Sequence, residues 1–534
     1  MKKLMLVVSV AFSLAAMADV IYVTPEGTGS GATWQDAANV YDAFANAAAD
    51  AEVWMQQGDY PLEKTSELAA PNAIRVYGGL AGDETQLPEK VSGKSVLHSA
   101  LTNLVLSAAS GEYVLRNLVI SNGLFRGVSK PNKSSIALYD CDIVYNGRAT
   151  LADFKAYFGT SDDKVAKAKA IQGRGLYLKG DANATVKMSN CLVKGNVDVR
   201  DTANCNNAGY GVYAETFKTV LLNDVMFFNN GTMEAVANRG AAYGRDSSRG
   251  WALYAKSAPV VATNCAFVAN RGSSNHNSGQ DEGAVCVDTS DGSLFSHCRW
   301  VGNSAEGSSK TAPGGVINLF EAAAEFDHCT VAYNLANRGY CAGLVVRPRK
   351  AATSVKIRNS IFWGNIIPTD SGKATDIHVI NNSSGSVTLD IDSTLFRAEN
   401  GCIGSDYANT TVIPGENVIY GDPRFVTSGD EVLAMMATTG TKLEFPMSDY
   451  KFYFKDIDAI GAIDVHLKST RGRWNGSAWV KDDVSSMAID RGEGEFTREP
   501  SPNGEAANLG CYGNTEEASM TSLVKSAINI PFSP

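Results

Sequence analysis

Three features are scarce or missing in this sequence, and each absence excludes a class of protein. Beyond the first 18 residues no stretch approaches about 18–20 continuous apolar residues, so no membrane-spanning helix is expected. Basic residues do not predominate, since 47 lysines and arginines stand against 57 aspartates and glutamates, which argues against nucleic-acid binding. Only six histidines occur and none forms an HExxH pair, so this zinc-protease motif is missing.

The N-terminus has the pattern of a secretion signal. Lys2 and Lys3 precede the apolar run Leu4–Met17, and Ala16–Ala18 offers a small-residue cleavage site before Asp19. Residues 1–18 are therefore predicted to be a signal peptide, and the mature chain carries a net charge of -10 - 2 = -12. We expect a protein that is secreted to the extracellular space or the outer cell surface, with the periplasm as the alternative.

A short phrase recurs along the chain, and Asn190–Asn196 (NCLVKGN) is its clearest copy. Counting weaker copies, the phrase closes at residues 122, 146, 196, 229, 270, 303, 334, 365 and 399. The successive spacings are 24, 50, 33, 41, 33, 31, 31 and 34, a period typical of a solenoid. Each repeat also contains a glycine-led strand, such as GRGLYLK at Gly173, and both halves alternate with period two.

These patterns predict an all-β fold, a single right-handed parallel β-helix whose core is on the order of 40 Å long. Residues 19–95 are expected to form an N-terminal cap and the first strands, with a capping helix at Ala37–Ala49. Residues 96–400 are assigned to the β-helix repeats, and 401–534 to an irregular C-terminal cap and tail. The two long spacings suggest insertions, a helical one at Ala149–Ala170 and a polar loop at Gly231–Gly250.

Half of the ten cysteines share one place in the repeat, five residues before its closing residue: Cys141, Cys191, Cys265, Cys298 and Cys329. One small residue type at one slot predicts a stacked interior column of reduced, buried thiols. The closing Asn is expected to tolerate a left-handed turn conformation and to stack into an amide ladder. The sequence does not decide between thiol and disulfide for Cys205, Cys286, Cys341, Cys402 and Cys511.

The pairing of a Gly-Gly-Val strand at Gly314–Val316 with aromatic-x-x-Asn strands at Phe267–Asn270 and Phe362–Asn365 resembles the polymorphic outer-membrane-protein repeat. More widely, the chain is similar to bacterial secreted right-handed parallel β-helix repeat proteins, with VYGGLAGDET at Val76–Thr85 resembling their N-terminal region. The resemblance implies the fold. It leaves the activity open, because such groups include adhesin-like proteins and polysaccharide lyases.

The hypothesis that the protein is a polysaccharide lyase has candidate catalytic and calcium-binding residues. A β-helix lyase needs a Lys or Arg base and often Ca²⁺ to neutralise the uronate carboxylate. The basic stretch at the end of one repeat strand supplies the candidate catalytic residues Arg347, Arg349 and Lys350. Candidate calcium ligands are Asp281, Glu282 and Asp288. The alternative is a solvated basic turn with ordinary surface acids.

The hypothesis that the protein binds a glycan has a different set of candidate residues. Aromatic residues flank the long polar loop, and sugar rings stack on exposed aromatic faces. The candidate ligand-binding residues are Arg239, Arg245, Arg249, Tyr213, Trp251 and Tyr254. Tyr213 and Trp251 can equally be packed inside, because alternation does not say which side of the strand they take.

Two further site types are disfavoured by spacing. His297-Cys298 and His328-Cys329 suggest a metal site, yet adjacent residues on a strand point to opposite faces and do not converge. β-helix hydrolases of the polygalacturonase kind carry paired Asp and a Gly-His-Gly stretch. The sequence has no Gly-His-Gly, and its Asp pairs lie off the repeat strands.

The sequence therefore favours an exported, non-catalytic β-helix that binds a polysaccharide or cell-surface glycan and needs no cofactor. The alternative is a lyase or hydrolase acting on an acidic polysaccharide, with Ca²⁺ as its cofactor if it is a lyase. A purely structural envelope role is the third reading. The oligomeric state is not predicted.

Overall fold

The computed structural model describes residues 19–521, apart from 63–66, 100–103, 109–110, 131–132, 148–172, 199–205, 233–246, 273–282, 306–314, 337–340, 349–351, 368–375, 381–384, 439–451, 455, 495–497 and 505. The predicted signal segment and the insertion at Ala149–Ala170 thus lie outside the described residues. Of the described helices, none is long and apolar enough to cross a membrane.

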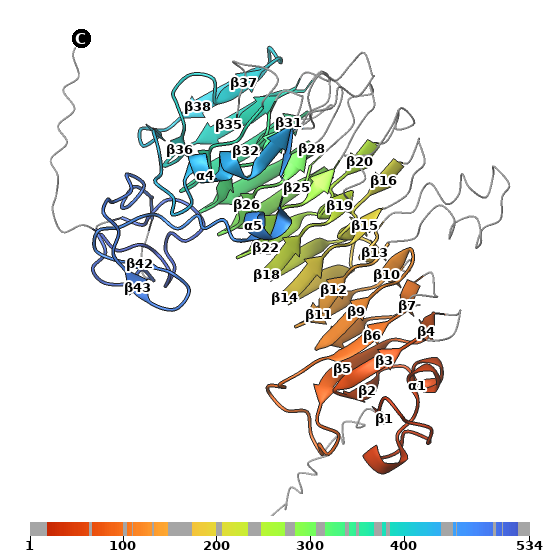
Figure 1. The fold of residues 1–534 in the computed structure, drawn as a ribbon. Coiled ribbons are helices and arrows are strands. Elements are labelled where there is room, and N and C mark those ends of the chain that lie inside the picture. The colour runs from red at the N-terminus through yellow and green to blue at the C-terminus, as the bar shows by residue number, and fades with distance from the viewer. Residues whose placement is uncertain are drawn as a thin grey trace, which may run out of the picture.

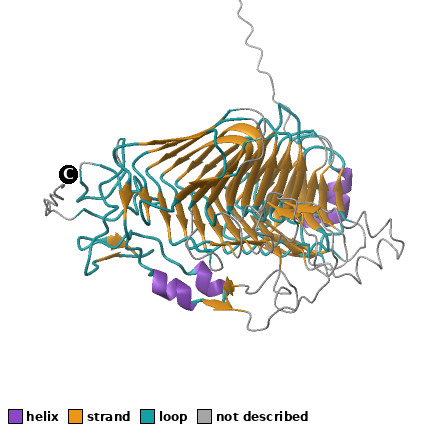
Figure 2. Cartoon of the chain, turned by 90° about the horizontal axis from the view of Figure 1, so that it is seen from above, coloured by secondary structure: helices purple, strands orange, loops and turns teal. Residues whose placement is uncertain are grey.

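The chain is a parallel β-helix in which each coil contributes strands to three faces (Figures 1 and 2). Face A consists of β4 (Leu68–Ala70), β7 (Leu104–Ala108), β10 (Arg126–Lys130), β13 (Leu176–Lys179), β17 (Val212–Glu215), β21 (Leu253–Lys256), the first halves of β25 (Val285–Ser296) and β28 (Ile317–Asp327), β31 (Leu344–Arg347), β34 (Ile377–Val379) and β37 (Ile403–Ser405). Of these, the strands from β13 to β31 are the glycine-led strands of the repeat.

Faces B and C are built from the other two segments of each coil. Face B consists of β1 (Val20–Val23), β2 (Ala51–Gln56), β5 (Ile74–Leu80), β8 (Tyr113–Arg116), β11 (Ile136–Tyr139), the first halves of β14 (Thr185–Lys194) and β18 (Thr219–Phe228), β22 (Val260–Thr263), the second halves of β25 and β28, β32 (Thr353–Arg358), β35 (Val387–Ile391) and β38 (Thr410–Pro414). Face C consists of β3 (Gly58–Pro61), β6 (Ser95–His98), β9 (Leu118–Ser121), β12 (Asp142–Val144), the second halves of β14 and β18, β23 (Ala266–Val268), β26 (Arg299–Val301), β29 (Thr330–Ala332), β33 (Ile361–Trp363), β36 (Leu395–Phe396) and β39 (Ile419–Tyr420).

Shorter elements complete the chain. A narrow parallel sheet follows face C and consists of β15 (Val197–Asp198), β19 (Gly231–Thr232), β24 (Arg271–Gly272), β27 (Ser304–Ala305) and β30 (Leu335–Ala336). The remaining strands form three pairs, β16 (Asn206–Ala208) with β20 (Ser247–Arg249), β40 (Met436–Thr438) with β41 (Phe452–Phe454), and β42 (Arg473–Trp474) with β43 (Trp479–Val480). The helical segments are η1 (Trp34–Asp36), α1 (Val40–Asn46), α4 (Gly429–Ala434) and α5 (Ile457–Gly461).

Left-handed residues turn the corners of each coil. The corner between faces B and C holds one in every repeat, with φ between 41° and 59°: Asn117, Asp140, Asn190, Asp224, Asn264, His297, His328, Asn359 and Ser393. Asn and Asp adopt this conformation more readily than other side chains do, which explains the Asn that begins the repeated phrase. The second left-handed corner lies one residue before the closing Asn, at Gly195, Gly302 and Gly364 for example. Along the ladder the closing Asn is not itself the left-handed residue, which corrects the prediction. Asn122, predicted to close its repeat, turns this corner instead with φ 61°, and the N–H of Gly123 after it donates to Asn146 Oδ1.

The closing Asn residues form the predicted amide ladder. The side-chain Nδ2 of each donates to Oδ1 of the next, over 2.9–3.0 Å, along the series Asn146, Asn196, Asn230, Asn270, Asn303, Asn334 and Asn365. The ladder passes through Asn230, whereas the repeat was predicted to close at Asn229, which instead turns the corner with φ 52°. The true spacings on either side are therefore 230 - 196 = 34 and 270 - 230 = 40.

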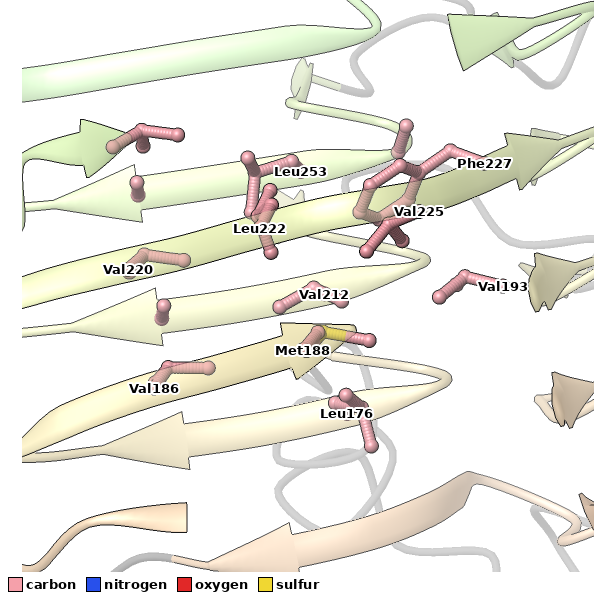
Figure 3. Close-up of a cluster of buried hydrophobic side chains, with 14 of the residues drawn as sticks. Leu176, Val186, Met188, Val193, Val212, Val220, Leu222, Val225, Phe227 and Leu253 are labelled. Carbon is pink, nitrogen blue, oxygen red and sulfur yellow. The ribbon is translucent and has the colours of Figure 1, made fainter. Parts of the chain in front are cut away.

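The interior is filled by the inward residues of the three faces, as Figure 3 shows for Leu176, Val212 and Leu253 of face A. The five cysteines of the repeat slot are buried and free, as predicted, with Val225 filling the same slot in the coil of β18. Cys286, Cys341, Cys402 and Cys511 are buried free thiols as well, and Cys205 lies outside the described residues.

The two ends of the solenoid differ. At the N-terminal end α1 packs Ala43 and Phe44 into the core, within the range predicted for a capping helix. At the other end, the described part of residues 421–521 lies along face C instead of over the last coil. Phe425 packs against Tyr333. Gly302 lies against the side chain of Ile460, and Gly461 lies against the ring of Phe228, so that a side chain at either glycine would crowd these residues.

Candidate functional site

The outer side of face A brings several predicted residues into two rows that run along the solenoid axis. Register pairs Tyr177 with Tyr213, Tyr254 and Cys286 in turn, which we call the tyrosine row. Two residues further along each strand lies the charged row, formed by Lys179, Glu215, Lys256, Asp288, Phe320 and Arg347. Parallel pairing without register shifts places one member per coil, about 4.8 Å apart.

The tyrosine row is a closed stack. The ring centroids of Tyr177 and Tyr213 lie 5.3 Å apart, and those of Tyr213 and Tyr254 lie 5.4 Å apart, with interplanar angles of 24° and 26°. Tyr213 and Tyr254 are each only 3% exposed, and burial raises the pKa of both phenols. Both faces of Tyr213 are covered by neighbouring rings, so the predicted sugar-stacking role of these two tyrosines is contradicted by their packing.

Trp251 is also packed inside. Its side chain is fully buried, and a Cβ added at Gly272 of β24 would overlap the indole ring. The absence of a side chain at Gly272 is thus what makes room for Trp251. The packed alternative for this residue is confirmed, and the sugar-stacking role is wrong.

The exposed part of the face is a three-residue ion-pair ladder. Glu215 accepts from Lys179 of the preceding coil over 2.9 Å and from Lys256 of the following coil over 3.3 Å. The Tyr213 hydroxyl donates to the same carboxylate over 3.0 Å. The side chains of Lys179 and Lys256 are 42% and 45% exposed, against 20% for Glu215, so the two ammonium groups are more accessible to solvent than the carboxylate.

The ion pairs of this ladder shift the pKa values of Glu215 and Lys179 in favour of their charged forms. Burial works against the charge of Glu215, but the hydrogen bonds from Lys179 and Tyr213 outweigh it and hold the pKa of the carboxyl below its usual value. The Glu215 carboxylate in turn raises the pKa of Lys179. At the N-terminal end of the tyrosine row the Arg126 guanidinium lies 4.2 Å from the centre of the Tyr177 ring, where burial lowers its pKa to about 10.

Two residues of the lyase hypothesis, Asp288 and Arg347, lie in the same row but are not accessible. Asp288 is 5% exposed, and its carboxylate accepts from the hydroxyls of Tyr254 (2.6 Å) and Thr289 (2.7 Å). Arg347, also 5% exposed, packs its guanidinium 5.2 Å from the centre of the Phe320 ring. Arg349, Lys350, Asp281 and Glu282 lie outside the described residues, as do Arg239 and Arg245 of the binding hypothesis. Arg249 ends β20 and is partly exposed.

No group of three or more His, Cys, Asp or Glu side chains within the described ranges is placed to hold a metal ion. The rings of His297 and His328 stack at 4.9 Å with parallel planes on the outside of the corner, whereas Cys298 and Cys329 point into the core. This opposite orientation is what strand geometry predicted for the two His-Cys pairs.

Sequence reasoning missed Arg126, Tyr177, Lys179, Glu215 and Lys256. The signal was present as a repeated frame, because Tyr-x-Lys at 177–179, Tyr-x-Glu at 213–215 and Tyr-x-Lys at 254–256 stand at the same place after the leading glycine. Aligning the glycine-led halves of the repeat as columns would have shown the alternating charge.

Comparison with known proteins assigns no family. No protein-family model matches the chain, and no curated protein matches it either. Solved structures that overlap it include the pectate lyase Pel9A (12% identity, 92% of this chain and 96% of that one, TM-score 0.31). Another is endopolygalacturonase I from Stereum purpureum, crystallised with two galacturonates (13% identity, 70% of this chain and 98% of that one, TM-score 0.25). Both overlaps are loose, and the assignment as a parallel β-helix rests on the strand register of this chain.

Proposed function

We propose that the protein is an exported β-helix that binds acidic polysaccharides along face A without cleaving them. The observation that carries this proposal is that face A exposes positive charge although the chain as a whole is negative. In a chain of net charge -10, the charged row of face A exposes Lys179 and Lys256 on either side of Glu215. The carboxylate of Asp288 in the same row is buried, and Arg126 covers the end of the tyrosine row. The signal-like segment and the resemblance to outer-membrane-protein repeats support an exported, surface location.

The geometry suits a polymer better than a small ligand. Lys179 and Lys256 project from coils two apart, so their strands are separated by about 9.6 Å along the axis. Each exposed ion pair contributes little by itself, about 0–1 kcal/mol. A chain that carries a carboxylate on each sugar can engage both ammonium groups at once, and linked contacts of this kind gain avidity without any new contact type.

The two described residues that were predicted for the lyase alternative, Arg347 and Asp288, are not accessible. Both are buried, and a general base must come within hydrogen-bond reach of the proton that it removes. The carboxylate of Asp288 is already bound to two hydroxyls, which removes it as an open calcium ligand in this arrangement.

Gel retardation and calorimetry on the Asp19–Pro534 protein test the proposal with uronate-bearing and neutral polysaccharides, with and without Ca²⁺. We expect binding to the uronate polymers only, weakening as salt is added because the contacts are exposed. The double variant Lys179→Ala with Lys256→Ala should lose at least about tenfold in affinity, which corresponds to 1.4 kcal/mol. Lys187→Ala is the matched control, because Lys187 is exposed on face B beside Tyr139.

Binding that survives the double variant, or binding to neutral polymers alone, would contradict the proposal. The same incubations are read for unsaturated uronates by absorbance and for new reducing ends. Product in either assay would establish the enzymatic alternative, and Arg347→Ala and Arg349→Ala would then identify its base.

A further inference from the structure

The last coil of the solenoid exposes part of its core to solvent on faces B and C, although Cys402 and Tyr407 of this coil are buried. The inward column that contains Leu389 ends at Val412, which is 41% exposed, and the inward column of Phe396 ends at Tyr420, also 41% exposed. Both positions are almost fully buried one coil earlier. In Figure 1 the strands of this coil, among them β37 and β38, stand at the end of the stack opposite β1.

The edge of this coil is also unpaired. Among the described strands, β37 pairs only with β34, β38 only with β35, and β39 only with β36, so each leaves its outer backbone groups free of strand partners. Natural edge strands are usually protected by charged side chains or by a covering segment. Here residues 407–415 (YANTTVIPG) contain no charged residue, and Ile413 on the outer side of β38 is 49% exposed.

The opposite end cannot serve as the partner surface. There the segment before α1 covers the outer edge of β1, since the N–H of Tyr22 donates to the carbonyl of Gly31 and its carbonyl accepts from the N–H of Ala38, both over 2.9 Å, and α1 packs Phe44 into the core. Head-to-tail stacking, which would propagate into a filament, is therefore blocked by this N-terminal cap. A second copy can meet the open coil only with its own open coil, and that contact closes at two subunits.

We propose that the last coil is a homodimer interface in which two copies pair their β38 strands antiparallel about a twofold axis at Val412. In this register Thr410 faces Pro414 of the second copy, Thr411 faces Ile413, and Val412 faces Val412. The nearest charges, Asp406 and Glu416, face uncharged Val418 and Ala408, so no like charges oppose one another. The exposed ends of the two cores, at Val412 and Tyr420, then cover each other.

A second copy fits this end for two reasons. The open surface is the cross-section of one coil, and another copy presents the same cross-section with the same apolar columns. The β38 backbone also continues its sheet across the axis, and the edge position tolerates Pro414, which lacks an N–H donor. The interface lies at the end of the axis and so leaves face A accessible on both subunits.

Sedimentation velocity and light scattering of the Asp19–Pro534 protein over a range of micromolar concentrations test the dimer. We expect twice the chain mass for the parent protein and the chain mass for Val412→Lys, since two ammonium groups would meet at the axis. Leu433→Lys is the matched control, because Leu433 is 53% exposed on α4 and should leave the dimer intact. Circular dichroism confirms that both variants are folded.

A disulfide between the two copies at the twofold axis would support the dimer directly. Val412→Cys should give a covalent dimer under mild oxidation, whereas the nine described native thiols are buried and should not. Three results would overturn the proposal. They are a monomeric parent at every concentration, a dimer that Val412→Lys leaves unchanged, and a dimer lost on ending the chain at Thr521, which would show that residues 522–534 and not β38 hold the dimer together.

Discussion

Asn365 donates its side-chain N–H to the carboxylate of Asp376 over 2.7 Å and so couples a seven-residue amide ladder to a buried acid. Within the ladder each Oδ1 accepts from the backbone N–H and from Nδ2 of the preceding Asn, as Asn303 does from Asn270. All the side-chain donors therefore point toward the C-terminal coils, and a carboxyl oxygen accepts the last hydrogen bond of the series at that end.

Asp376 should make the protein less stable as the pH rises. Burial raises the pKa of its carboxyl to about 7, against the hydrogen bonds from Asn365 and Cys402 and the charge of Arg397, which lower it. Its unfolded pKa is about 3.9, so the folded state binds the proton more tightly. The stabilisation is present below about pH 4 and is lost as the pH rises through about 7.

The variant Asp376→Asn should remove this pH dependence by extending the ladder with an eighth amide. We expect its midpoint of thermal unfolding to exceed that of the parent by more at pH 8 than at pH 4.5. The measurement is calorimetry of both proteins at the two pH values. An equal difference at both would show that Asp376 does not titrate in this range.

Interrupting the ladder should be costly, because each member satisfies several buried groups. Asn303→Ala removes the acceptor of two Asn270 donors and leaves the carbonyl of Phe267 without its side-chain donor. We expect a loss of roughly 2–4 kcal/mol in the free energy of unfolding, measured by urea titration. Asn264→Gly is the control, since Asn264 is exposed with φ 59°, a conformation that Gly adopts without steric strain, and the substitution removes only an exposed hydrogen bond to Asp224. Losses of equal size would show that the ladder has no special role.

The sequence predicted the coils well because each coil repeats the same physical problem. A left-handed corner, an inward slot for a small side chain and a buried amide recur in every repeat, so Asn, Cys and Asn recur with them. The error at Asn229 arose where two Asn residues are adjacent, because Asn suits both the corner and the ladder. The error at Asn122 arose where Gly123 takes the closing position and leaves Asn at the corner alone. Only the hydrogen bonds between coils show that Asn230 is the ladder residue.

The candidate site was harder to predict, because it depends on what covers a strand. Alternation did not show which side of the strand Tyr213 takes, and it gave no sign that neighbouring rings enclose Tyr213 and Tyr254 on the outer side of face A. Residue type alone did not show that the guanidinium of Arg347 packs on the ring of Phe320. The side chains that cover these residues come from coils about 30 residues away in the sequence. A prediction made for one strand at a time does not include them.

The thiols should be unreactive in the folded protein. Burial raises the pKa of Cys191 and Cys402 to about 11, and raises that of Cys265 and Cys298 as well, while the thiolate is the reactive form. A thiol-specific reagent should modify all ten cysteines in denaturant and at most Cys205 under native conditions. Rapid native modification of several thiols would show that the described core opens readily.

His297 should have the opposite pH effect to Asp376. Burial and the neighbouring His328 ring, with a smaller contribution from Arg498, lower the pKa of His297 to about 4, although Asp327 and the backbone at Gly513 favour its charged form. The folded state thus prefers the neutral ring, and the stabilisation is present above about pH 6.5 and lost as the pH falls toward 4. His297→Asn places at this corner the residue found in the adjacent repeat at Asn264. We expect its unfolding midpoint, relative to the parent, to be higher at pH 4.5 than at pH 7.5, the reverse of the trend for Asp376→Asn. If both variants shifted stability in the same direction with pH, a general loss of packing would explain them better than titration of either group.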